Sequence, residues 1–395
     1  MFARRTDWKL EPNRFARALD AHRAGGVELL DLTASNPTTC GFVYPDREIL
    51  QALADRRTLE YVPESKGMRS AREAVAGYYA QRIGHGGGRG GVDPERIILT
   101  AGTSEAYSYI FRLLCEVGDE ILVPAPSYPL FEFLADLNDV RLSPYPLLYD
   151  HGWQMDFAAL RAGITPRTRA ILLVNPNNPT GSFLRAEEAA QLSKLCAERE
   201  MAIVADEVFL DFTAEPAAQP TFALHDACLT FTLSGLSKIS ALPQMKLAWV
   251  AVNGPDKQAQ AAVERMEIIA DTYLSTGTPV QLALCKLLEI GRDMQVQLKS
   301  RIAANLTRLD SWLLAQKEVT RLQREGGWYG ILRAPATRAD EDLAVAVLEQ
   351  CSVLVHPGQF FDFPNGGYLV ISLIAKEREF EEGVRRLLAF LNTQP

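Results

Sequence analysis

Short apolar runs that alternate with longer amphipathic segments constrain the fold of this chain more than any other feature. Each run is bounded by polar or turn-forming residues, and the five clearest occupy residues 96–100, 120–123, 170–174, 202–205 and 230–233. Runs this short suit buried strands better than buried helices. Because helical segments separate them, the pattern predicts a mostly parallel sheet with helices on both faces.

The other segments extend this α/β prediction to the whole chain. Helices are predicted over residues 104–115, from residue 130, and over residues 186–199, 280–316 and 377–391. Beyond residue 279 the segments GGWYGIL, VLVHPGQFF and YLVISL resemble strands of a second, smaller domain. We therefore predict an N-terminal arm with part of the small domain at 1–45, a large domain at 46–280 and the small domain at 281–395.

Composition bounds the possible partners. The chain has 395 residues, of which 47% are hydrophobic, and its 41 basic and 49 acidic residues give a net charge of −8. A mildly acidic chain without a long basic run is a poor candidate for binding nucleic acid or anionic membranes. No apolar stretch approaches the roughly 18 residues of a transmembrane helix. The N-terminus lacks the apolar core of a signal peptide, so we expect a cytoplasmic protein.

Several common site types have little support in the sequence. The six cysteines are widely spaced and include no CxxC pair, which argues against a zinc knuckle or a dithiol redox site. No HExxH or GxSxG motif occurs, so zinc hydrolysis and Ser/His/Asp chemistry are not expected, and no metal site is predicted. The glycine-rich segment at residues 84–91 lacks a following Lys-Ser/Thr pair, and we interpret it as a surface turn.

Four polar groups follow predicted strands, at the sheet edge where such folds bind ligands. Lys238 lies in SGLSK after one strand, and Asp206 ends another. A lysine there can form an imine with a carbonyl cofactor, and a buried carboxylate requires a partner such as a pyridine nitrogen. The segment 102–104 precedes a helix whose N–H groups suit a phosphate. Asn178 lies in the turn NPNNPTG.

The order of these motifs resembles one family throughout. TAGTSEA, PAPSYP, NPNNPTG, ADEVF and LSGLSK are similar to class I/II aminotransferases, which are pyridoxal-phosphate (PLP) enzymes of fold type I. The likeness runs from about residue 30 to the C-terminus and includes EYVPESKGMRSAREA, GGWYGIL, HPGQFF and YLVISL. It implies a mostly parallel seven-stranded sheet between helices, with a smaller α/β domain.

The resemblance also implies a role for each matching residue. Lys238 is expected to hold PLP as a Schiff base and to act as the base, with Asp206 on the pyridine nitrogen and Asn178 on the ring hydroxyl. Tyr128 is expected to stack on the ring. The expected phosphate ligands are Gly102, Thr103, Ser104, Ser237, Lys246 and, from the partner subunit of a homodimer, Tyr61.

Three positions depart from the family pattern. Phe209 replaces a tyrosine that bonds the ring hydroxyl, so the pKa of the Schiff base is expected to be less depressed. Lys246 replaces an arginine and so gives up its planar fork. Val370 replaces the arginine that clamps the substrate α-carboxylate. Lys376, Arg69 and Lys66 are the nearby candidate cations, each interpreted first as a solvated surface charge.

The loop TASNPTT offers a further pair of candidates. Ser35 and Asn36 lie where the family places a loop over the substrate, and either they contact the substrate or they form a simple Asx turn. His356, in HPGQFF, is interpreted either as a residue near the site or as a packed residue at a strand end.

The resemblance favours an aminotransferase that moves an amino group from an amino acid to a 2-oxo acid in two half-reactions. Loss of the carboxylate arginine keeps a second hypothesis open, namely another PLP reaction such as a C–S β-lyase, decarboxylase or racemase, or an amine donor. A third hypothesis is a non-catalytic binding domain. It ranks last because Lys238 and Asp206 are both present and no DNA-binding extension is found.

Overall fold

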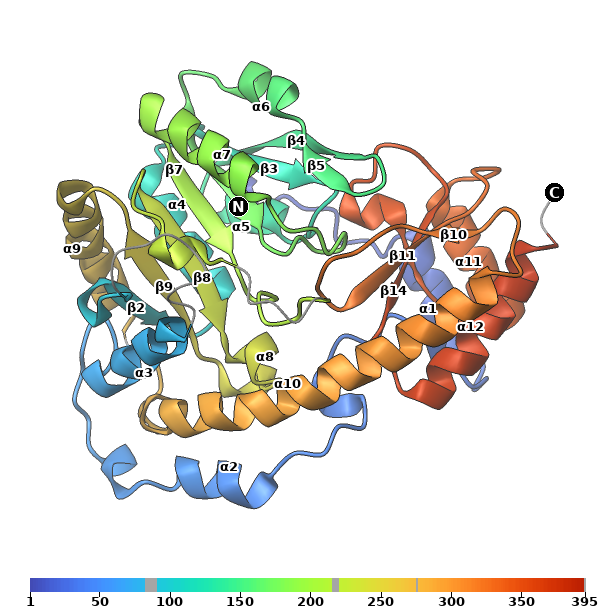
Figure 1. Cartoon of the computed structure of the whole chain (residues 1–395), viewed down its shortest axis with the longest axis horizontal. Coiled ribbons are helices and arrows are strands. Elements are labelled where there is room, and N and C mark those ends of the chain that lie inside the picture. The colour runs from blue at the N-terminus through green and yellow to red at the C-terminus, as the bar shows by residue number, and fades with distance from the viewer. Residues whose placement is uncertain (82–90, 215–219, 275, 394–395) are drawn as a thin grey trace.

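An eight-stranded mixed sheet forms the centre of the larger part of the molecule (Figure 1). In spatial order its strands are β2 (Ile97–Thr100), β9 (Ala248–Asn253), β8 (Thr230–Gly235), β7 (Ala202–Asp206), β6 (Thr168–Val174), β3 (Glu120–Ala125), β4 (Arg141–Tyr149) and β5 (Trp153–Met155). This computed structural model describes residues 1–81, 91–214, 220–274 and 276–393. The predicted glycine-rich turn at 84–91 lies outside the described residues except for Gly91.

The sheet agrees with the predicted mostly parallel arrangement. Strands β8, β7, β6, β3 and β4 run parallel to one another, whereas β9 is antiparallel to both β2 and β8. The seven strands from β2 to β4 form the expected sheet, and β5 adds an eighth strand by an antiparallel hairpin with β4. The sequence analysis did not predict the strands β4, β5 and β9.

Helices cover both faces of the sheet because alternate side chains of each strand point to opposite faces. One face packs against α4 (Thr103–Leu114), α5 (Phe131–Leu137) and α9 (Asp256–Tyr273). The other face packs against α3 (Arg69–Ala80) near β2 and against α6 (Phe157–Gly163) and α7 (Ala186–Glu198) near β6. The predicted helices 104–115 and 186–199 are therefore confirmed to within one residue at each end.

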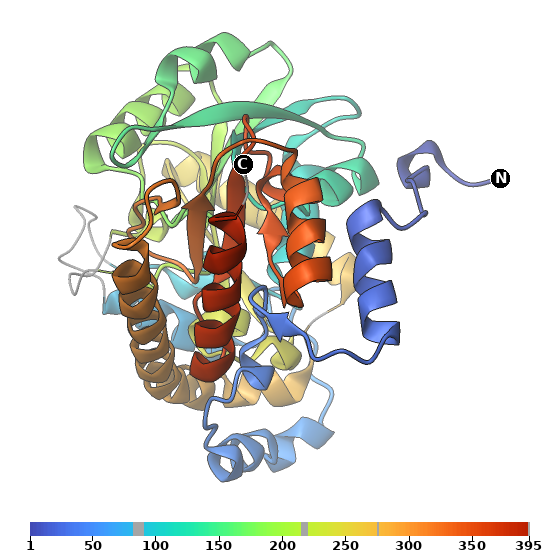
Figure 2. The same ribbon diagram turned by 90° about the vertical axis from the view of Figure 1, so that its right-hand side faces the viewer.

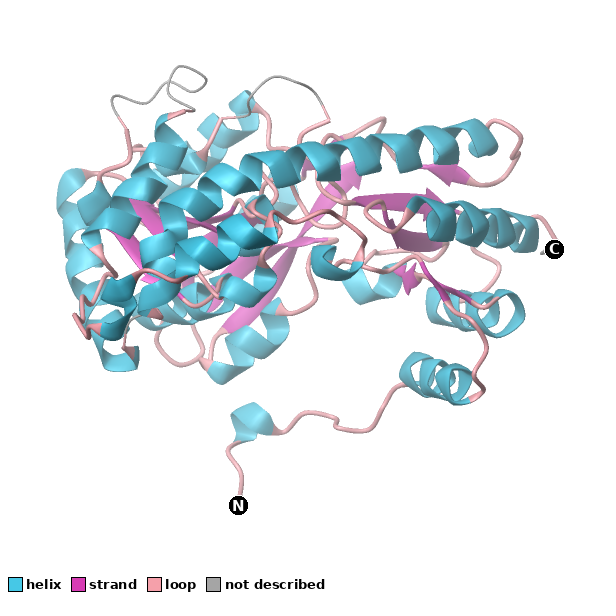
Figure 3. Cartoon of the chain, turned by 90° about the horizontal axis from the view of Figure 1, so that it is seen from below, coloured by secondary structure: helices cyan, strands magenta, loops and turns pink. Residues whose placement is uncertain are grey.

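A single long helix joins the large sheet to the smaller part of the molecule (Figure 3). Helix α10 (Thr278–Leu313) has 36 residues and so extends roughly 54 Å. The smaller part contains a four-stranded sheet in the order β10 (Thr320–Arg321), β11 (Tyr329–Arg333), β14 (Tyr368–Ser372) and β13 (His356–Pro357). Its helices are α11 (Asp340–Cys351) and α12 (Glu377–Leu391), and α12 has the predicted bounds.

The N-terminal segment contacts both parts of the molecule, and Figure 2 shows it along one side. Helix α1 (Arg14–Ala24) lies beside α11, where the backbone N–H of Phe15 donates to Glu341 Oε1 at 3.2 Å. Ahead of it, Trp8 Nε1 donates to Oδ2 of Asp136 in α5 at 2.9 Å. After α1, strand β1 (Leu30–Asp31) pairs in parallel with β12 (Val353–Leu354). We propose the domain boundaries 1–45, 46–280 and 281–395 on this basis.

Candidate active site

The carboxyl ends of the parallel strands open onto a cavity that contains most of the predicted site residues. Its walls include seven of them, Ser35, Thr103, Tyr128, Asn178, Asp206, Ser237 and Lys238. The same walls include six further residues besides Phe209, namely Phe131, Val174, Val208, Gly235, Ala248 and Tyr329. Both parts of the molecule contribute, because Ser35 follows β1 and Tyr329 begins β11.

Lys238 is presented by a short turn of helix directly after β8. Gly235 ends that strand opposite Ala248, and a Cβ on Gly235 would lie only 2.7 Å from the Ala248 Cβ, so this close approach requires glycine. The Lys238 Nζ lies 5.1 Å from the ring centre of Trp328 and 5.6 Å from that of Phe209. Burial lowers the pKa of Lys238, and the negative charge of Asp206 partly offsets this effect.

Asp206 is the last residue of β7, and its carboxylate is buried. The Tyr107 hydroxyl donates to Oδ2 at 2.7 Å, and the backbone N–H of Val208 donates to Oδ1 at 3.1 Å. Burial raises the pKa of Asp206, and these hydrogen bonds and the charge of Lys238 act in the opposite direction. The result is a carboxylate held in one orientation that still lacks a full counter-charge.

The three asparagines of NPNNPTG have different surroundings. Asn175 Oδ1 accepts from the backbone N–H of Leu184 at 3.0 Å. Asn177 Nδ2 donates to Pro126 O at 3.0 Å and to Thr180 Oγ1 at 2.9 Å. Asn178 lines the cavity, and its buried Oδ1 has no hydrogen-bond partner within the described part of the chain. Asn178 is therefore the one of the three whose amide is available to a ligand.

The N-terminus of α4 faces the same region. Gly102 is the extended N-cap residue, and Glu105 Oε2 accepts from the backbone N–H of Ala101 at 2.7 Å. Thr103 lines the cavity, whereas Gly102 and Ser104 do not. The first N–H groups of a helix lack intrahelical partners and carry partial positive charge, which suits an anion.

Three other predicted residues lie away from this cavity. Lys246 is exposed, and Tyr61 is 77% exposed on the segment before α3. Asn36 Oδ1 accepts from the backbone N–H of Thr38 at 3.1 Å and from its hydroxyl at 2.8 Å. Of the two alternatives given for Asn36, substrate contact or an Asx turn, the structure shows the Asx turn. Only Ser35 of this pair lines the cavity.

The candidate cations for a substrate carboxylate are engaged in ion pairs elsewhere. Lys66 Nζ lies 2.6 Å from Glu95 Oε2, Arg69 Nε lies 2.8 Å from Glu73 Oε1, and Lys376 Nζ lies 3.1 Å from Glu379 Oε1. None of these three cations lines the cavity. The interpretation as a surface charge therefore fits Arg69 and Lys376, whose side chains are 55% and 50% exposed, but not Lys66, whose side chain is only 13% exposed.

Sequence reasoning missed Tyr107 and Tyr329. Tyr107 lies four residues after Thr103, so both are on one face of α4. That spacing was a usable signal, because a side chain one turn from the helix start faces the neighbouring strand ends. Tyr329 lies in the quoted motif GGWYGIL, but only the fold brings it to Ser35.

The free groups of the cavity match the polar groups of PLP. Asp206 offers a carboxylate for the pyridine nitrogen, the Asn178 amide suits the ring hydroxyl, and the start of α4 suits the phosphate. The Lys238 amine suits the aldehyde. The rings of Phe131 and Phe209 supply apolar walls. The residues present therefore fit this cofactor.

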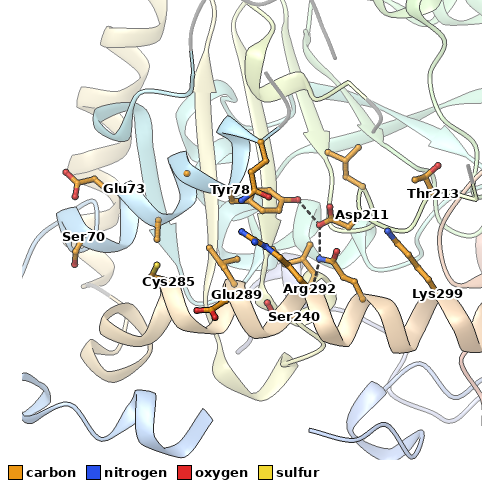
Figure 4. Close-up of a pocket in the computed structure, with 17 residues that line it drawn as sticks. Ser70, Glu73, Tyr78, Asp211, Thr213, Ser240, Cys285, Glu289, Arg292 and Lys299 are labelled. Atoms are coloured by element: carbon orange, nitrogen blue, oxygen red, sulfur yellow. Dashed lines mark hydrogen bonds between the residues drawn. The ribbon is translucent and has the colours of Figure 1, made fainter. Parts of the chain in front are cut away.

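A larger cavity, of about 720 Å³, lies behind the Lys238 segment, between α3 and α10 (Figure 4). Within it Tyr78 donates to Asp211 Oδ2 at 2.9 Å. Gln295 Nε2 donates to the same oxygen at 3.3 Å and to the backbone O of Ile239 at 2.9 Å. None of the predicted site residues lines this cavity, and Gln295 connects α10 to the residue directly after Lys238.

Comparison with known proteins identifies similar chains. A family model described as "Aminotransferase class I and II" matches residues 27–387. The glutamate-pyruvate aminotransferase AlaA of Escherichia coli K12 is 29% identical over 374 residues, covering 93% of this chain and 91% of that protein. The alanine aminotransferase of Mycobacterium tuberculosis H37Rv is 29% identical over 389 residues, covering 93% and 86%.

Solved structures show the same fold. An aminotransferase from Escherichia coli superposes with a TM-score of 0.85 at 27% identity, covering 98% of this chain and 99% of that one. Alanine aminotransferase from Pyrococcus furiosus has a TM-score of 0.87 at 23% identity, with both chains fully covered.

The described ranges of this chain contain no helix with the length and hydropathy of a membrane span. Within the same ranges, no group of His, Cys, Asp or Glu residues is arranged to hold a metal ion.

Proposed function

The chain belongs to the class I and II aminotransferase family, and on that premise we propose that Lys238 carries its PLP and that its amino donors are small amino acids without a charged side chain. The protein is an enzyme that transfers an amino group from an amino acid to a 2-oxo acid. The relatives reported above are all named aminotransferases, so the β-lyase and decarboxylase hypotheses are not favoured.

One observation carries the assignment of Lys238. Its amine and the carboxylate of Asp206 line one cavity and are not ion-paired with each other, although burial works against the charged form of both. Two such groups left apart are costly in a folded protein unless a ligand uses them. A cofactor with an aldehyde at one position and a pyridine nitrogen at another satisfies both groups.

The residues divide the chemical work. When bound, PLP supplies an electron sink for the electron pair left on the donor's α-carbon. Asp206 holds a proton at the pyridine nitrogen, and Tyr107 keeps the carboxylate oriented. Lys238 Nζ takes up the α-proton and returns it, and its lowered pKa increases the fraction of neutral amine. Asn178 orients the ring hydroxyl, Tyr128 covers the ring, and Phe209 helps to exclude water.

The phosphate is proposed to lie at the start of α4. Gly102, Thr103 and Ser104 supply the first N–H groups of the helix, and Ser237 faces the same cavity. Lys246, which does not line the cavity, is proposed to add positive charge toward the phosphate without the planar fork of an arginine.

The charges of the cavity support a small uncharged side chain on the donor. Among the described residues that line it, Lys238 is the one cation and Asp206 the one anion. Both have roles toward the cofactor, so a charged side chain of the donor has no counter-charge from this subunit. The alanine–pyruvate pair is the simplest that fits. The alanine aminotransferase and the pyruvate of the AlaA name agree with this pair, whereas the glutamate of the AlaA name is a charged donor for which this cavity has no counter-charge among the described residues.

We also propose a homodimer in which Tyr61 of each subunit reaches the phosphate site of the other. Support comes from an apolar surface made of Leu59, Tyr61, Val62, Tyr273 and Leu274, all exposed in the single chain. The two segments lie together because Ser65 Oγ donates to Asp271 Oδ1 at 3.1 Å. A surface of this kind is typical of a protein interface.

A cytoplasmic location is proposed from the six unpaired cysteines.

Borohydride reduction of the holoenzyme, followed by peptide mass spectrometry, tests the assignment. We expect the cofactor mass on the peptide that contains Lys238, and the same label in a Lys246→Arg control. A label on another lysine overturns the assignment. Addition of L-alanine is expected to convert the cofactor to its pyridoxamine form with release of pyruvate. Release of ammonia or CO₂ without that form contradicts transamination.

A further inference from the structure

The small sheet presents one face toward the site, and this face changes from apolar to polar along its length. Cross-strand partners in antiparallel strands share a face, so Val370 faces the same way as its partners Ile331 and His356. The next pair on that face, toward the cavity, is Tyr329 opposite Ser372.

The position of Val370 is closed to a charged ligand. Val370 is fully buried in a cluster with Trp153, Phe361 and Phe363. His356 lies beside this cluster, and burial lowers the pKa of its imidazole, which keeps the ring neutral. Neither Val370 nor His356 lines the cavity. A substrate carboxylate therefore has neither space nor a counter-charge at this end of the face.

Two hydroxyl groups lie at the cavity end of the same face. Ser35 and Tyr329 both line the cavity. Burial raises the pKa of Tyr329, and the Ser35 side chain acts in the opposite direction. Tyr128 lines the same cavity, and burial, with a smaller contribution from Tyr329, raises the pKa of the Tyr128 phenol to about 12.

The fold holds these two hydroxyls in place from behind. Ser372 Oγ donates to Ala34 O at 2.6 Å, which ties the loop that contains Ser35 to the strand residue paired with Tyr329. The Asx turn of Asn36 fixes the next residue of the loop. Ser35 and Tyr329 thus come from opposite ends of the chain and are anchored to one point. Preorganised donors of this kind lose little entropy when they bind a ligand.

We propose that the Ser35 and Tyr329 hydroxyls bind the α-carboxylate of the substrate, as a pair of neutral donors in place of a guanidinium. The inference rests on the proposed function, because it names how that same site recognises an α-amino acid. A hydroxyl that donates to a carboxylate forms a charge-assisted hydrogen bond. Two such bonds give selectivity for α-amino acids over amines without a buried cation.

The test compares Ser35→Ala and Tyr329→Phe holoenzymes with the wild type and with Tyr368→Phe. Tyr368 is a matched control, because it lies on the same face of β14, stacks on Phe363 and does not line the cavity. Two ligands are used, L-alanine and its analogue without the carboxylate, ethylamine, with conversion of the cofactor as readout. Equilibrium binding of propionate, measured by calorimetry, reports on the carboxylate site independently of turnover.

We expect each of Ser35→Ala and Tyr329→Phe to weaken propionate binding and to raise the KM for L-alanine by about tenfold or more. The rate with ethylamine is expected to stay near the wild-type value, and Tyr368→Phe to change neither ligand. Unaltered propionate binding overturns the inference, as does an equal loss with alanine and ethylamine. A wild-type protein that converts no donor refutes the proposed function instead, while propionate binding still tests the two hydroxyls.

Discussion

The Tyr107 hydroxyl donates a 2.7 Å hydrogen bond to Oδ2 of Asp206, although the two residues are 99 positions apart in the chain. Both side chains are buried, so water does not replace this bond easily. The phenol is on α4, whose N-terminus is proposed to hold the phosphate, and the carboxylate is at the end of β7. On that proposal, one helix contributes to two separate parts of the cofactor site.

Replacement of Tyr107 by Phe is expected to weaken the hold of Asp206 on the cofactor. The hydrogen bond lowers the pKa of Asp206, so its loss raises that pKa further and favours the neutral acid. A hydrogen bond to a charged group contributes about 1.5–3 kcal/mol, and we expect the dissociation constant of PLP to rise about tenfold or more. Fluorescence titration of the apoenzyme measures this constant. Unchanged affinity in Tyr107→Phe contradicts the role given to the phenol.

The apoenzyme is expected to lose stability as pH rises, in part because of Asp206. The pKa of Asp206 is raised in the folded protein, so protonation of Asp206 stabilises the fold. This contribution to the free energy of unfolding is fully present below the ordinary aspartate pKa of about 3.9. This contribution is lost as pH rises through the raised pKa. Residue 206 cannot titrate in Asp206→Asn. The free energy of unfolding of this variant, relative to that of the wild type, should therefore rise from about pH 4 to pH 7. Urea unfolding of both apoenzymes across that range measures the difference, and a constant difference would falsify the prediction.

Adjacent asparagines are expected to have opposite phenotypes. Asn177 makes hydrogen bonds with Pro126, Thr180 and Ser127, so Asn177→Ala should lower the free energy of unfolding by about 2 kcal/mol or more. Asn178 Oδ1 has no partner in the described part of the chain, so Asn178→Ala should leave the apoenzyme about as stable as the wild type. We expect it instead to weaken PLP binding about tenfold. Chemical unfolding and cofactor titration of the two variants separate these effects, and similar behaviour of both would refute the distinction.

Val370→Arg is expected to harm the protein rather than improve it. The side chain is fully buried and clusters with the apolar rings of Trp153, Phe361 and Phe363, which offer a cation no counter-charge. An unpaired buried cation costs about 3 kcal/mol or more, so unfolding should occur at a clearly lower denaturant concentration. Val43→Arg is a control, because Val43 is 75% exposed. Higher activity of Val370→Arg on L-alanine would show that the position is open to the substrate carboxylate.

Much of the fold was predictable because it depends on local patterns. The apolar residues of α12 recur at Phe380, Val384, Leu387 and Leu391, one helical face, and the predicted bounds of this helix are confirmed. Strand β4 was missed because its exposed and buried residues do not alternate clearly and two prolines interrupt it. Strand β9 was missed because it follows Lys246 without a turn signal, although it supplies the Ala248 that packs on Gly235.

The amino-acid sequence by itself determined the chemical groups and their order, namely a lysine, an aspartate and a helix start that each follow a strand. These depend on neighbours along the chain, and periodicity and turn residues are sufficient to place them. Only the tertiary structure decided which groups share a cavity. It turned Asn178 and not Asn177 toward the cavity, joined Tyr107 to Asp206, and brought Ser35 to Tyr329 while it enclosed Val370 in aromatic rings. The physical reason is that burial and hydrogen-bond partners come from segments distant in sequence, and a pattern along one segment carries no record of them.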